Sequence, residues 1–404
     1  MRLLTVATLM TTALLASNSV TPSAANAATY YVAKTGSDSN SCPSAQATAT
    51  PKLTIKSGLS CVKAGDTLSV RAGTYAEPID SNALTLPTGT SWANAPRIAA
   101  YSGEKVTLTR GSSTRVFNFQ NPYVQYLIFD GFVLDATGAE NGIKIQAGAH
   151  HVRIQNCEVK NSAGQGILMT GGTLTHHNEI LRCNIHDHGK DLHFDHGIYI
   201  AASDNLVEDC DVHHNLAYGV HVYDGSTHAA HRNIVRRVKS HDNGENGILI
   251  GSGTGNLAYN NIVYANGKAG IQVGFSGASG NKVYNNTIYK NGGEGLQIRS
   301  TASGTLVKNN IIYSNLVAIN NQGVTTTLSN NLTTDPRFVN AAGSDFHLTS
   351  GSAAVDKGIL LSEIPDDYER TPRPAGASYD IGADEYLPVS ASPSAPTSFQ
   401  IVLQ

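Results

Sequence analysis

Apolar and polar residues alternate in short runs along the chain, most regularly between residues 123 and 325. Alternation with a period of two is typical of β-strands, whereas no segment keeps a helical period over ten residues. Turn-forming residues, mainly Asn, Gly, Ser and Asp, separate these runs. The pattern therefore predicts many short strands joined by tight turns.

The same segment repeats itself with the approximate template N-x-V-x-x-N-x-I-x-x-N-x-x-x-G-I-x-I. Its G-I-x-I glycine recurs at spacings of 22 to 31 residues, at positions 142, 166, 197, 219, 247, 270 and 295. A fixed period in this range indicates a solenoid. We expect an all-β protein, a right-handed parallel β-helix with about three short strands in each coil.

Two columns of like residues support this interpretation. One column reads Cys157, Cys183, Cys210, Val238, Asn261, Asn286, Asn310, and the other reads Asn215, Asn243, Asn266, Asn291, Asn315. Stacked coils place equivalent residues above one another, so these asparagines can hydrogen-bond along the axis. Cysteine in such a column acts as a small buried apolar residue. The remaining cysteines, Cys42 and Cys61, can pair with each other near the N-terminus.

The segments outside the repeat predict the domain organisation. Residues 1–27 resemble an export signal, with Arg2, an apolar run and a small-x-small cleavage site. We expect an N-terminal cap with the first coils over 28–120, regular coils over 121–327 and a segment that closes the C-terminal end over 328–387. A Pro/Ser tail follows at 388–404. The mature protein is expected to be secreted and monomeric.

Composition excludes some partners. Only 15% of residues are charged and the net charge is −3, so a nucleic-acid surface, which needs clustered Lys and Arg, is not expected. Beyond the N-terminal signal, no apolar run reaches membrane length, so no membrane partner is expected either.

The repeat is interrupted at two neighbouring places. His188 is nine residues from Gly197, whereas the equivalent spacing is four in the next four coils, so this coil carries a five-residue insertion. A second enlarged loop follows Tyr223. Twelve of the fifteen histidines lie between His176 and His241. Function in solenoids concentrates at such interruptions, so we place the candidate site between these loops.

Strand alternation assigns the outward side chains near the two loops. Tyr199, His221 and Tyr223 point outward, and a neighbouring strand presents Lys239. A wall of cationic and phenolic groups suits an extended acidic polysaccharide. Proton abstraction beside a carboxylate needs a group that neutralises the carboxylate, a base and an acid. We assign catalysis to Tyr199, His221 and Lys239, and substrate binding to Tyr223, His196, His193, Lys190, His213, Arg299 and Lys144.

The repeats also resemble a known group of proteins. The turns and strands "SHDNGENGILI", "IVYANGKAGIQV" and "TIYKNGGEGLQIRS" look like coils of the mannuronan C5-epimerase catalytic module and of right-handed β-helix polysaccharide lyases. β-Helix alginate lyases pair a tyrosine with a lysine, and the resemblance implies these roles for Tyr199 and Lys239. The Tyr-Gly-Phe-Asp-Pro-His segment of the epimerases corresponds to "YGVHVY", which lacks Asp-Pro-His.

The sequence favours a secreted polysaccharide lyase that cleaves a uronic-acid glycan, with alginate as the first substrate, by β-elimination. Three alternatives stay open: an epimerase of the mannuronan type, a glycoside hydrolase, and a non-catalytic glycan-binding protein. A hydrolase needs two carboxylates at a fixed separation. Its candidates are Asp195, Glu208, Asp209 and Asp211.

No metal or other cofactor is expected. The motif His186-x-His188, with His193 and His196, forms an alternative transition-metal set. Calcium is kept as a second alternative, although the sequence shows no carboxylate-rich calcium loop.

Overall fold

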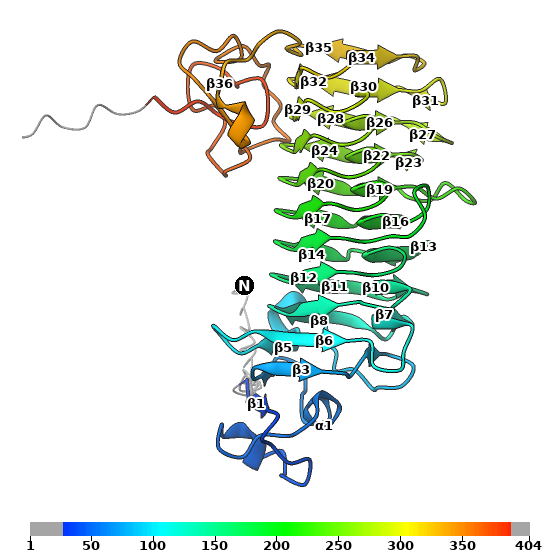
Figure 1. Ribbon diagram of the computed structural model, residues 1–404, viewed down its shortest axis with the longest axis vertical. Coiled ribbons are helices and arrows are strands. Elements are labelled where there is room, and N and C mark those ends of the chain that lie inside the picture. Colours follow the sequence, from blue (N-terminus) through cyan, green and yellow to red (C-terminus); the bar gives the residue numbers. More distant parts are fainter. Residues whose placement is uncertain (1–26, 389–404) are drawn as a thin grey trace, which may run out of the picture.

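The chain winds into a parallel β-helix, which the computed structural model describes over residues 27–388 (Figure 1). The predicted signal peptide and tail lie, except for one residue each, outside this range. Each regular coil gives one strand to each of three parallel sheets, in the order C, A and B. No helix in the described range is long and apolar enough to cross a membrane.

The three long sheets hold most of the strands. Sheet A contains β1 (Thr29–Val32), β2 (Thr67–Val70), β5 (Arg97–Ala100), β8 (Gln125–Asp130), β11 (His150–Gln155), β14 (Glu179–Leu181), β17 (Leu206–Glu208), β20 (Ile234–Arg236), β24 (Leu257–Tyr259), β28 (Lys282–Tyr284), β32 (Leu306–Lys308) and β35 (Thr327–Ser329). Sheet B contains β3 (Gly73–Tyr75), β6 (Val106–Thr109), β9 (Val133–Asp135), β12 (Glu158–Lys160), β15 (Asn184–His186), β18 (Asp211–His213), β21 (Lys239–His241), β25 (Ile262–Tyr264), β29 (Thr287–Tyr289) and β33 (Ile311–Tyr313). Sheet C contains β4 (Ile79–Asp80), β7 (Arg115–Gln120), β10 (Asn141–Gln146), β13 (Ile167–His176), β16 (Ile198–Ser203), β19 (Val220–Val222), β22 (Ile248–Ile250), β26 (Ile271–Val273), β30 (Glu294–Ile298) and β34 (Val317–Asn321).

The remaining elements are short. They are the small parallel sheet of β23 (Gly253–Thr254), β27 (Ala278–Ser279) and β31 (Ala302–Ser303), the antiparallel pair β36 (Phe338–Asn340) and β37 (Asp345–Leu348), the helix α1 (Ile55–Leu59), and 3₁₀ turns at Ser44–Gln46, Trp92–Asn94 and Ala341–Gly343.

Strand alternation fills the interior of the coils as the sequence predicts. In β16, Ile198 and Ile200 are fully buried while Tyr199 between them faces outward and is half-buried. Ile198 pairs in register with Val220 of the next coil, so apolar side chains stack along the axis. This stacking buries a continuous core, which no single coil can form alone.

Asparagine ladders run along the turns. In the predicted second column, Asn243 Nδ2 donates to Asn266 Oδ1 over 2.9 Å, and Asn266 repeats this bond to Asn291. The structure adds a third ladder, formed by Asn178, Asn205, Asn233, Asn256 and Asn281. Backbone groups at these buried turns are satisfied by side-chain amides, which explains the high asparagine content.

The cysteines take the predicted roles. Cys42 and Cys61 form a disulfide. Cys157, Cys183 and Cys210 are free and buried, and burial raises the pKa values of Cys157 and Cys183 well above the usual value. Thiols buried in apolar surroundings are inert, so these three residues are structural.

The C-terminal segment lies along the side of the β-helix rather than over its end (Figure 1). Its apolar residues pack on the outer faces of sheets A and B, for example Leu361 and Ile364 on Tyr259 and Tyr284. The expectation that residues 328–387 close the C-terminal end is therefore wrong. The side chain of Leu316, in the last coils of the described range, is 79% exposed.

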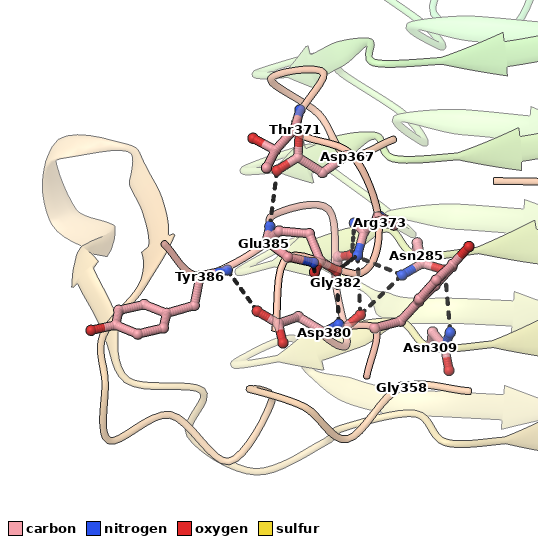
Figure 2. A network of polar contacts seen from close by, with 12 residues as sticks. Asn285, Asn309, Gly358, Asp367, Thr371, Arg373, Asp380, Gly382, Glu385 and Tyr386 are labelled. Atoms are coloured by element: carbon pink, nitrogen blue, oxygen red, sulfur yellow. Dashed lines mark hydrogen bonds and ion pairs between the residues drawn. The ribbon is translucent and has the colours of Figure 1, made fainter. Parts of the chain in front are cut away.

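Figure 2 shows the polar network that fixes this segment to the coils. Arg373 and Glu385 form a fully buried ion pair, and Arg373 Nη2 also donates to the Gly382 carbonyl over 2.8 Å. Asn285 donates to the Asp380 carbonyl over 3.1 Å. The backbone carbonyl of Asn309 accepts the Gly382 backbone N–H over 2.7 Å. Separating the partners of a buried ion pair leaves an unpaired buried charge and is strongly destabilising, so this contact holds the segment in one orientation.

Candidate active site

The predicted residues Tyr199 and His221 lie side by side on the outer face of sheet C. They are paired neighbours on β16 and β19, and their rings stack with centroids 4.8 Å apart at 12°. Tyr223, two residues further along the chain, has its ring centroid 5.3 Å from that of His221, and the two ring planes are 3° apart. Parallel register and strand alternation together produce this row of three rings.

A pocket of about 330 Å³ opens over these rings. The insertion between His188 and Gly197 supplies one rim, with Phe194 67% exposed, and the turn after β26 supplies the other, with Phe275 50% exposed. The lining residues are Gln165, His193, Phe194, His196, Tyr199, Tyr218, His221, Tyr223, Leu249 and Phe275. Exposed aromatic faces around a few polar groups suit a sugar ring.

A buried histidine pair forms the floor of the pocket. His196 Nε2 and His221 Nδ1 are 2.9 Å apart, and His196 Nδ1 accepts the Tyr218 backbone N–H over 3.4 Å. Both bonds are satisfied when His196 carries its proton on Nε2 and donates it to His221. Neutral imidazole holds one proton, so His221 then carries its own proton on Nε2. This arrangement makes His221 a hydrogen-bond donor.

Burial keeps these groups uncharged. It lowers the pKa of His196 to about 3, and burial together with His196 lowers the pKa of His221 well below its usual value. Burial, with smaller effects of Tyr223 and Asp224, raises the pKa of Tyr199 to about 12. Tyr199 is therefore a protonated phenol at neutral pH, which is the form of a general acid.

A buried carboxylate lies behind the rim of the pocket. Glu245 is 1% exposed and pairs with Lys268, with Nζ 2.6 Å from Oε2. Its other oxygen lies 3.4 Å from Nδ1 of the exposed His193 and has no hydrogen-bond partner among residues 27–388. A small rotation lets His193 donate to this oxygen, and a carboxylate that orients an imidazole in this way supports a general base.

Three further predicted residues lie near the pocket without lining it. Arg299 follows β30, with its guanidinium 5.6 Å from the Phe275 ring. Lys144 is on the same face of sheet C, two coils before Tyr199. Lys190 is exposed on the insertion, where its backbone N–H donates to Asp195 over 2.8 Å.

Two predicted residues lie elsewhere. Lys239 and His213 are on sheet B, so the expected pairing of Lys239 with Tyr199 is wrong. Lys239 instead lines a separate cavity beneath the C-terminal segment, with His347 and Asp384. His213 stacks between His186 and His241 at 5.0 and 5.1 Å. Consecutive strands of one coil belong to different sheets, so outward residues on them do not share a wall.

Sequence reasoning missed half of the pocket lining. Tyr218 directly precedes a G-I-x-I type glycine, and Phe194 is part of the recognised insertion, so a search for aromatic residues at these places finds both. Gln165, Leu249 and Phe275 carry no comparable signal.

The structure separates the histidines of the alternative metal set. His188 is buried at the end of an asparagine ladder, where burial lowers its pKa to about 3 and its Nε2 bonds the Val159 carbonyl at 2.9 Å. His186 is on the outer face of sheet B. Only His193 and His196 of this set reach the pocket.

Two known β-helix families match this chain. The family described as "Right handed beta helix region" matches residues 124–274 and 196–357, together more than half of the chain, and "Pel9A-like, right handed beta helix region" matches residues 30–194. No curated protein sequence matches significantly.

Solved structures resemble this chain at low sequence identity. Pectate lyase Pel9A aligns with a TM-score of 0.69 and 17% identity over 88% of this chain and 96% of its own. A rhamnogalacturonan lyase follows, with 0.57 and 15% over 77% and 90%. XylC with xylose follows, with 0.55 and 12% over 89% and 98%. Identities this low show the fold alone. The predicted architecture is confirmed, and the chain belongs to the right-handed β-helix family.

Proposed function

We propose that this protein is a secreted polysaccharide lyase that cleaves a uronic-acid glycan by β-elimination, with alginate as the first substrate to test. The observation that carries the proposal is the protonated Tyr199 beside the neutral His221, in an aromatic-rimmed pocket on sheet C. The lyases among the structural neighbours share this fold and are consistent with the proposal.

β-Elimination needs three groups around one sugar. A base removes the proton on C5 beside the carboxylate, the C4=C5 double bond forms, and the C4–O bond breaks as an acid protonates the leaving oxygen. A donor that binds the carboxylate stabilises the charge that develops on it. The pocket offers His193 backed by Glu245 as base, Tyr199 as acid and the His221 N–H as that donor.

The aromatic side chains of the rim contribute substrate binding rather than chemistry. Phe194 and Phe275 present exposed rings on opposite sides of the pocket. Arg299, beside Phe275, adds a positive charge for a neighbouring uronate of the same polymer. Arg299 is exposed, so its charge is available to an acidic ligand.

Export is part of the proposal. The N-terminal pattern of residues 1–27 resembles a signal peptide, and the Cys42–Cys61 disulfide is typical of oxidising compartments. The N-terminal residue of the protein recovered from the culture medium tests this, with Ala28 expected.

Activity is tested by ultraviolet absorbance of the unsaturated uronate, with alginate, pectate, glucuronan and hyaluronan as substrates. We expect a new double bond with at least one of them, and its absence with all four contradicts the proposal. Tyr199→Phe should lower the rate of product formation by about 10²–10⁴-fold. Tyr123→Phe is the matched control, because Tyr123 is 81% exposed and outside the pocket.

A further inference from the structure

Four histidines form a compact array at the corner between sheets C and A. The dipeptide His150–His151 begins β11, and His176–His177 occupies the equivalent place one coil later. His150 stacks on His176 at 4.9 Å and 9°, and His151 stacks on His177 at 5.0 Å and 5°. Neither the pocket over sheet C nor the proposed lyase chemistry uses any of them.

Backbone geometry fixes the array. His151 and His177 both adopt left-handed conformations, with φ of 53° and 54°, where each coil bends into sheet A. This bend turns the two rings of each dipeptide toward each other, so that their Nδ1 atoms are hydrogen-bonded at 2.7 Å in both coils; a bound metal ion would replace the proton of this hydrogen bond. Tyr126, Asp204 and Arg232 adopt the same left-handed turn in the neighbouring coils, so this turn is a regular feature of the corner and gives the two His-His pairs the same geometry.

The nitrogen atoms are close enough to share one ion. In the described part of the chain, His150, His151 and His176 are the only three His, Cys, Asp or Glu residues whose ligand atoms all lie within 4.8 Å of one another. Imidazole nitrogens suit zinc, copper and nickel. We propose that His150, His151 and His176 bind a divalent transition-metal ion, with Cu²⁺ preferred.

The preference for Cu²⁺ follows from the spacing within each dipeptide. With metal–nitrogen bonds of about 2.0 Å, two ligands 2.7 Å apart subtend about 85° at the metal, near the 90° of a tetragonal site. Tetrahedral ligands of zinc are about 3.3 Å apart at the same bond length. Copper also binds nitrogen sites most tightly among the first-row divalent ions.

The surroundings favour a neutral, ordered set of ligands. Tyr126 stacks on His151 at 4.4 Å, and Trp92 lies 6.0 Å from the same ring. Asp204, the carboxylate of the next coil, is already paired with Arg232 at 2.6 Å. Burial, with repulsion from the neighbouring histidines, lowers the pKa of His151 to about 4, so its imidazole is uncharged at neutral pH.

Trp92 provides a direct test because it is the only tryptophan in the sequence. Bound Cu²⁺ quenches a nearby indole, so titrating CuCl₂ into the metal-free full-length protein should quench Trp92 fluorescence with saturation at one equivalent. His150→Gln/His151→Gln should raise the apparent Kd at least tenfold, and so should His176→Gln alone. Melting curves of the metal-free variants establish that each one folds.

The chain supplies a matched control in His213–His214. These residues also place their Nδ1 atoms 2.7 Å apart, but His214 has no stacked partner and both belong to the sheet B side. His213→Gln/His214→Gln should leave the quenching unchanged. Quenching that survives loss of His150 and His151, or that disappears in the control, overturns the proposal. Metal binding is measured without any glycan, so a negative result in the quenching assay is independent of the result of the lyase assay.

Discussion

Removing one rung of an asparagine ladder should destabilise the β-helix strongly, and Asn266→Ala is the sharpest case. The Asn266 side chain is 2% exposed. Its amide donates to Asn291 Oδ1, the Ser240 carbonyl and the Tyr264 carbonyl at 2.9, 3.0 and 3.1 Å. Its oxygen accepts from the side chain and the backbone N–H of Asn243 at 2.9 and 3.2 Å.

The magnitude follows from these five contacts. A typical hydrogen bond contributes about 1 kcal/mol net, and a buried group left without a partner costs about 1–3 kcal/mol. The backbone N–H of Asn243 loses its side-chain acceptor, whereas Asn291 Oδ1 still accepts the Asn266 backbone N–H. We therefore expect Asn266→Ala to lower the free energy of unfolding by about 3 kcal/mol.

Urea unfolding followed by circular dichroism measures this loss. Asn82→Ala is the control, because Asn82 is exposed and outside the ladders, and it should change stability by less than about 0.5 kcal/mol. Amide exchange should show that protection is lost first in the coils next to Asn266, since each coil contacts only its neighbours. A loss below about 1 kcal/mol for Asn266→Ala would refute the view that the ladder bonds stabilise the fold.

Three further predictions concern proton transfer and charge. Tyr199→Phe should lower kcat on the accepted glycan by about 10²–10⁴-fold with little change in KM, and a comparable kcat would remove Tyr199 as the acid. Glu245→Gln should lower kcat with little change in KM, because His193 loses the carboxylate that orients it; an unchanged kcat would exclude Glu245 from catalysis. The cavity beneath the C-terminal segment should make stability pH-dependent. Burial raises the pKa of Asp384 to about 7; burial opposes the charge of His347, but Asp345, Asp384 and Glu369 raise the pKa of His347 to about 9. The folded protein holds the Asp384 proton more tightly than the unfolded chain does, so ionisation of Asp384 lowers the stability of the fold as pH rises from about 4 to 7. His347 loses its stabilising positive charge as pH rises from about 6.5 to 9. Thermal melts should therefore show that the wild type loses stability relative to Asp384→Asn as pH rises from about 4 to 7, and that stability falls as pH rises from about 7 to 9; an equal pH dependence of wild type and variant below pH 7 would contradict the assignment.

Several features of the candidate site could be predicted from local sequence. Alternation placed Tyr199, His221 and Tyr223 on the outer face, and the uneven spacing after His188 located the insertion that carries His193. Both signals depend on residues close together in the chain. The same reasoning failed for Lys239, because the bends between strands decide which sheet an outward residue joins.

The sequence by itself determined the repeat, the buried columns and the asparagine ladders, because each depends on the period of two and on stacking of like residues between coils. Tertiary structure alone decided which outward residues meet. It brought Phe275 from a later coil to the rim of the pocket, gathered His150, His151 and His176 at one corner, and placed the C-terminal segment on the side of the coils. These contacts join residues that no local pattern relates, since they depend on how each coil turns and on which surfaces then lie close together.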